Sequence, residues 1–134
     1  MYIIVIIIVI LILLLITKST IYYYYFNTTE TIIKGLSNIK YLPFNHIAIF
    51  DFKKYSNHSM WMKETYIPLD MIFLDHTYKI LGFVENTIPH SLKSLTIDKN
   101  SYYIIETNAG FINKYNLKIG DIFIDKFILI NLKK

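Results

Sequence analysis

The chain opens with an unbroken apolar run and continues as short apolar stretches separated by polar turns. Residues 1–16 carry no charged side chain, and the first charge is Lys18. A membrane-spanning helix needs about 20 apolar residues, with about 17 as the lower limit. Lys18 can snorkel, and the tyrosines at positions 22–25 resemble an interfacial aromatic belt. The pattern predicts an N-terminal transmembrane helix within residues 1–23, with 24–134 left for one domain.

The fate and orientation of this N-terminal segment follow from its flanks. A cleaved signal peptide has a basic start and small residues at the cleavage site, and neither occurs here. The sequence therefore favours an uncleaved signal anchor. Lys18 and Lys34 follow the run, so the positive-inside rule alone would place the domain in the cytoplasm.

The remaining pattern predicts a mainly β domain. Six short apolar stretches are predicted as strands, at residues 47–52, 60–65, 70–74, 80–85, 102–106 and 122–130. Hydroxyl residues before 31–36 and a glycine before 111–115 predict two short helices. Turn signals recur about every ten residues, which favours a compact antiparallel sandwich or barrel over alternating β and α units. The hairpin joining 70–74 to 80–85 is the most local of these features.

Composition narrows the possible functions. The net charge is +4, and all 14 basic residues are lysines scattered among acids, so nucleic acid is not a predicted partner. The absence of cysteine excludes disulfides, a lipid anchor on cysteine and a thiolate nucleophile. The four histidines lack the spacing of metal ligands, and no glycine-rich phosphate loop occurs. We therefore predict no metal and no cofactor.

A dense motif cluster carries a family resemblance. Positions 59–70 read SMWMKETYIPLD, and further motif residues follow at Glu85-Asn86, Pro89, Glu106 to Gly110 and Gly120-Asp121. Over about residues 31–124 the sequence resembles the bacterial and archaeal domain of unknown function 192 family, also called uncharacterised protein family 0127. The resemblance implies a sandwich-like mainly β domain without an assigned biochemical function. Members often follow an N-terminal signal or anchor, which implies the extracytoplasmic, periplasmic side of a membrane.

The chain departs from the pattern of that family at several positions. Ser37 replaces a methionine of the first helix, Glu64 replaces the asparagine after the motif lysine, and Tyr78 replaces a glycine of the hairpin turn. If the replaced asparagine or glycine lines a binding surface in the family, this member has altered it.

The candidate binding site consists of Trp61, Lys63, Asp70, Glu106 and Asn108. Its four polar residues are expected to converge on one pocket, with Trp61 as an aromatic wall. Each has a simpler structural alternative. The Asp70 carboxylate can accept backbone N–H bonds in the turn after Pro68, and Lys63 can form a surface ion pair worth at most about 1 kcal/mol.

Several functional readings stay open. The favoured one is a membrane-anchored module that binds a small ligand or an envelope protein, and an enzyme is the less favoured class. The alternative is a small hydrolase using two of Asp70, Glu85 and Glu106, which requires carboxyl groups about 5–9.5 Å apart. A copper(I) site on His58 and the methionines at 60 and 62, and a purely structural envelope role, are further readings.

Overall fold

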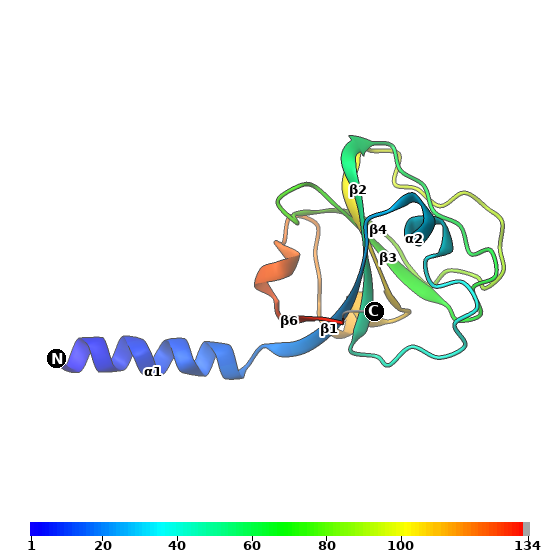
Figure 1. Cartoon of the computed structure of the whole chain (residues 1–134). Coiled ribbons are helices and arrows are strands. Elements are labelled where there is room, and N and C mark those ends of the chain that lie inside the picture. The colour runs from blue at the N-terminus through cyan, green and yellow to red at the C-terminus, as the bar shows by residue number, and fades with distance from the viewer. Residues whose placement is uncertain (133–134) are drawn as a thin grey trace.

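A computed structural model describes residues 1–132 of the chain. It consists of one helix that projects from a domain built on a single six-stranded sheet (Figure 1). The elements are α1 (Tyr2–Ile16), β1 (Ser19–Phe26), α2 (Thr29–Lys34), β2 (His46–Ser56), β3 (Leu69–Leu74), β4 (Ile80–Val84), β5 (Ser101–Asn108), α3 (Phe111–Lys114), the 3-10 turn η1 (Phe123–Asp125) and β6 (Phe127–Asn131). The prediction of a mainly β domain with few short helices is confirmed.

The sheet is mixed rather than antiparallel. Its strand order is β4-β3-β5-β2-β1-β6, and β1 runs parallel to both β2 and β6. The other neighbouring pairs are antiparallel, including the predicted β3–β4 hairpin. The prediction of an antiparallel sandwich is therefore wrong for β1, which pairs with strands that follow it at long range.

The tyrosine run belongs to this sheet and not to a membrane interface. Ile21 is fully buried, and the tyrosines at 22–25 are all half-buried within β1. Tyrosine is favoured in strands because its ring packs well on a pleated surface. The sheet thus starts at Ser19, and the boundary expected after residue 23 falls inside a strand. The predicted aromatic belt is corrected accordingly.

Both faces of the sheet are covered by apolar side chains. One core contains Ile47, Ile72, Ile105, Phe111 and Phe123 among others, under α3 and η1. The other contains Phe50, Met62, Met71, Phe73 and Ile104 among others, on the side of α2. Because successive residues of a strand alternate between faces, neighbours along β2, β3 and β5 divide between these two cores. That alternation decides where each candidate polar residue points.

The N-terminal helix α1 ends earlier than the sequence pattern predicts. It has 15 residues, apolar on every side, and Figure 1 shows it extending away from the domain. Among residues 1–132, no helix has both the length and the apolar character that crossing a membrane requires. The predicted transmembrane helix is therefore not supported by the structure.

Two predicted strands are also corrected. Residues 60–65 form a loop whose single ladder contact is the bridge between Met60 and Leu95. The predicted strand 122–130 is divided by η1, so that only its second half enters the sheet as β6.

The predicted helix at 31–36 is confirmed as α2, but it begins at Thr29 and ends at Lys34, two residues earlier at each end. The Thr28 hydroxyl accepts a hydrogen bond from the Thr31 N–H at 3.2 Å, and the Thr31 hydroxyl accepts one from the Thr28 N–H at 3.1 Å. These reciprocal bonds satisfy donors that a helix start leaves free. Gly35 ends the helix at φ +44°, with the Phe50 ring 3.2 Å from where a Cβ would lie. The close approach at Gly35 brings α2 down onto the sheet.

Candidate functional site

A cavity beside Trp61 lies between α2 and the loop 59–65, which we call the Trp61 segment. It has a volume of about 300 Å³ and is mostly apolar. We call it the Trp61 cleft; its lining residues are Ile32, Ile33, Phe52, Ser59, Met60, Trp61, Leu92 and Ser94. A volume of this size is at the lower end of the range for small-molecule sites.

Backbone hydrogen bonds hold the Trp61 segment in place. Met60 exchanges N–H···O bonds with Leu95 at 2.9 and 2.8 Å, and the Met62 N–H donates to the Ser91 carbonyl at 3.0 Å. In this extended stretch Met62 points into the core and its sulfur accepts a hydrogen bond from Thr87. Trp61 therefore points the other way and stays 48% exposed, as the alternation predicts.

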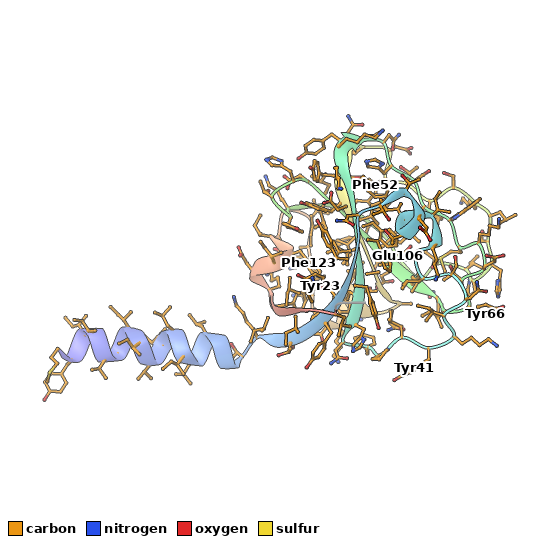
Figure 2. All side chains as sticks on the ribbon, viewed as in Figure 1. Tyr23, Tyr41, Phe52, Tyr66, Glu106 and Phe123 are labelled. Carbon is orange, nitrogen blue, oxygen red and sulfur yellow. The ribbon has the colours of Figure 1, made fainter. Side chains whose placement is uncertain are left out.

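Glu106 lies beneath this segment in the middle of the sheet. It is 4% exposed and belongs to β5, where it is paired with Ala48 of β2 and Met71 of β3. Figure 2 places Glu106 inside the domain on the side of α2. It shares a narrow crevice of about 20 Å³ with Trp61 and Lys63. That volume is enough for about one water molecule.

The Glu106 carboxyl has no hydrogen bond or ion pair to any part of the chain that the structure describes. Burial removes the water that would stabilise its charge, and this raises its pKa from 4.5 to about 8. At pH 7 the group is therefore mostly in its neutral, protonated form. It can donate one hydrogen bond and accept others at the bottom of the crevice.

Lysine side chains border the opening above Glu106. The Lys63 ammonium lies 5.3 Å from the centroid of the Trp61 ring, within the range of a cation–π contact. Lys34, from the last turn of α2, lines the same crevice. Trp61, Lys63 and Glu106 therefore come together, as the sequence predicts.

Asp70 belongs to a different place. It is 1% exposed on β3, directly opposite Thr107 and on the other face of the sheet from Glu106. Its carboxylate accepts three backbone N–H bonds, from Asn86 at 2.9 Å, Gly110 at 3.0 Å and Ile112 at 3.2 Å. Asp70 therefore accepts backbone N–H bonds, as its simpler structural alternative predicts, although the donors lie in other segments than the turn after Pro68. The prediction that it converges on one pocket with Lys63 and Glu106 is wrong.

Asn108 and Glu85 also lie apart from the cleft. The Asn108 side-chain amide donates to the carbonyls of Leu42 and Pro43 at 2.9 and 3.3 Å, so it fastens the loop before β2. Glu85 is exposed at the end of β4. Because Asp70 and Glu106 point to opposite faces, these two acids do not form the paired carboxyls of a hydrolase.

The copper(I) ligands considered from the sequence have protein partners instead. His58 stacks on Phe52 with centroids 3.9 Å apart, and its Nε2 lies 3.0 Å from the Lys54 carbonyl oxygen. Met62 is in the core, where Thr87 donates a hydrogen bond to its sulfur. Among the residues that the structure describes, no cluster of three or more histidine or acidic side chains has the geometry of a metal site.

The second wall of the cleft escaped the sequence analysis. Ile33 and Leu92 line the cleft and are 68% and 69% exposed. Ile33 is the second of two adjacent isoleucines in α2, and Leu92 belongs to the loop between β4 and β5. One signal was available, since two adjacent isoleucines in a six-residue helix cannot both face the core. The contribution of the loop had no such signal.

Comparisons with known proteins agree with this fold. The sequence model of the DUF192 family, described as "Uncharacterized ACR", matches residues 14–123 and confirms the resemblance seen in the motifs. A Sinorhizobium meliloti protein described as a candidate transcription regulator is 30% identical, with a TM-score of 0.73 over 75% of this chain and 78% of that one.

A second solved structure supports the same assignment. A Novosphingobium aromaticivorans protein of unknown function is 25% identical, with a TM-score of 0.71 over 75% of this chain and 71% of that one. No curated protein matches the sequence. The family match covers most of the chain and includes all the residues that line the Trp61 cleft. The chain therefore belongs to the DUF192 family.

Proposed function

We propose that this protein is a small-ligand-binding module, held at a membrane by α1, with the Trp61 cleft as its binding site. The observation that carries the proposal is Glu106, an almost fully buried carboxyl that opens onto a crevice beneath an apolar cleft and has no hydrogen bond within residues 1–132. Burying a polar group without a hydrogen bond costs free energy, and proteins rarely retain one unless it serves a purpose. A ligand that supplies the missing partner would account for it.

Binding is better supported than hydrolysis. Acid-catalysed hydrolysis of a glycoside needs a second carboxyl beside the first, and Asp70 is on the opposite face with its oxygens occupied by backbone donors. Glu64 lines a neighbouring hollow beside Trp61, where its side chain is exposed. A single neutral acid under an aromatic wall is better suited to holding a ligand.

The role of Trp61 is directly testable. In a thermal-shift screen of metabolite-sized compounds on the full chain in mild detergent, we expect at least one compound to raise the melting temperature. Trp61→Ala should weaken the binding of that compound about tenfold or more, because the variant removes one wall of the cleft. Tyr41→Ala is the matched control, since Tyr41 is 78% exposed outside the cleft. A broad screen without a hit would contradict the proposal and favour an envelope protein as partner.

The membrane part of the proposal is supported by α1. Its described side chains are exposed and apolar on all sides, so the helix has no polar face to turn toward water. A helix that is apolar all round is stable when buried in protein or lipid. Figure 1 shows no part of the domain lying over it. We therefore propose that α1 is buried in lipid. Because α1 ends at Ile16 and β1 begins at Ser19, the domain would lie close to the lipid surface.

A single charge in α1 should release the protein from lipid. Ile8→Lys places an ammonium in the middle of the helix, at a cost of about 3 kcal/mol on insertion scales. We expect the variant to lose about a hundredfold in its partition to neutral lipid vesicles, measured by flotation. Ile119→Lys is the control, since Ile119 is 65% exposed on the domain. Equal flotation of both variants would contradict the lipid anchor.

The side of the membrane follows from the family resemblance, which suggests an extracytoplasmic domain. A reporter enzyme fused after the last residue, active only outside the cytoplasm, tests this orientation. The description of the Sinorhizobium meliloti relative suggests a regulator of transcription. We do not extend it to this chain, because its lysines are scattered and arginine is absent.

A further inference from the structure

A second hollow, lined in part by polar side chains, lies next to the Trp61 cleft. This hollow has a volume of about 180 Å³, and Trp61 and Ile33 line both it and the cleft. Its polar lining comes from Lys34, Ser37, Asn38, Lys63 and Glu64. We call it the lysine basin. An apolar cleft and a polar basin that share one aromatic wall suit a ligand with two chemically different ends.

The charges around the basin favour a negative group. Lys34 and Lys63 contribute two positive charges and Glu64 one negative charge, while Glu106 below is neutral at pH 7. The neighbours of Glu106 on β2 and β3 are Ala48 and Met71, which carry no charge. The basin is thus net positive, and the buried acid offers a hydrogen-bond donor next to it.

We propose that the ligand of the Trp61 cleft is a small amphipathic anion, with an apolar chain or ring between α2 and Trp61 and a carboxylate or phosphate at Lys34, Lys63 and Glu106. This inference rests on the proposed function, because it names the ligand class of the same site. The head group takes charge-assisted bonds from the two ammonium groups. One of its oxygens, or one bridging water, occupies the crevice and accepts a hydrogen bond from the protonated Glu106 carboxyl.

A cationic ligand fits the same residues poorly. An amine could ionise Glu106 and pair with it, but it would lie beside Lys34 and Lys63. The Lys63 ammonium already occupies one face of Trp61, 5.3 Å from the ring centroid. The two ligand classes also respond to pH in opposite ways. Ionisation of Glu106 above about pH 8 would repel an anion and attract a cation.

The test uses four probes with the same apolar body, namely hexanoate, hexyl phosphate, hexanol and hexylamine. The full chain is reconstituted in neutral lipid vesicles, and binding is followed by tryptophan fluorescence. Trp61 is the only tryptophan, so the signal reports on the cleft alone. We expect one or both anions to bind at least tenfold more tightly than hexanol and hexylamine at pH 7. The two anions distinguish a carboxylate from a phosphate head group.

Variants identify the groups that hold the anion. Lys63→Gln should weaken the binding of the anion about tenfold. Lys118→Gln, on the other side of the sheet, should leave the binding affinity unchanged. Binding to the unmodified chain should weaken as the pH rises through about 8. Glu106→Gln keeps a neutral donor and should abolish that pH dependence, which a purely structural role would not do.

Each other outcome rejects the inference in a recognisable way. Saturable binding of hexylamine or hexanol in preference to both anions would overturn the ligand class and leave the proposed site intact. Anion binding that is insensitive to Lys63→Gln would also overturn it, because the head group would then lie outside the basin. If none of the four probes binds, the inference fails, and the broader thermal-shift screen decides whether the proposed function fails as well.

Discussion

Replacing Asp70 with alanine is expected to destabilise the domain by about 3–5 kcal/mol. Its carboxylate accepts backbone hydrogen bonds from two segments that are far apart in the sequence. One is Asn86 after β4, and the other is the turn at Gly110 and Ile112 where α3 starts. The variant would leave these donors without a partner at a site that is almost fully buried. Urea unfolding of the full chain in mild detergent measures the loss.

Asp75→Ala is the matched control for this prediction. Asp75 also accepts three hydrogen bonds, two from Thr77 and one from the Lys79 N–H, but in the exposed turn of the β3–β4 hairpin. Water can replace those bonds, so we expect a loss of about 1 kcal/mol or less. If Asp70→Ala were as mild as Asp75→Ala, Asp70 would not be a structural anchor, and a binding role for it would have to be reconsidered.

Local features of the fold were predictable from the sequence. The β3–β4 hairpin and the short helix α2 depend on neighbouring residues, such as the threonine pair that caps α2. Turn chemistry and capping are set within a few positions of the chain. The central stretch from Trp61 to Asp70 also carried enough specific residues to identify the family.

Long-range pairing was not predictable in the same way. Strand β1 pairs in parallel with β2 and β6, and its first residue, Ser19, lies opposite Phe127, which is far away along the chain. A run of tyrosines next to an apolar segment has the composition of a membrane interface and also of a central strand. Only the pairing decides between them, and a single sequence does not encode it in any local pattern.

The candidate site shows why register matters. Asp70 pairs with Thr107, and the next residue of β3, Met71, pairs with Glu106. A shift of one residue would have placed both acids on one face, because side chains alternate along a strand. The sequence identified Glu106 and Asp70 as the important acids but could not determine that they serve different faces. Trp61 and Lys63 were placed correctly because they are close to each other in the chain.

The second large effect is expected from Glu106→Gln, which should stabilise the protein by roughly 3–5 kcal/mol above pH 8. Burial raises the pKa of Glu106 from 4.5 to about 8, so the folded state holds a proton that the unfolded state has released. Between these two values the stability of the unmodified protein should therefore fall as the pH rises. Below about pH 4.5 both states are protonated and this loss disappears.

The pH dependence separates this explanation from a simple packing effect. Glutamine has the shape of the protonated acid but does not ionise, so unfolding free energies of the variant should stay flat where those of the unmodified chain decline. Glu85→Gln, at an exposed position, should keep the decline. A variant that is uniformly less stable at every pH would mean that Glu106 has a partner that glutamine cannot satisfy. In that case keeping an acid at position 106 would cost the protein no stability. The buried acid would then no longer be an argument for a ligand.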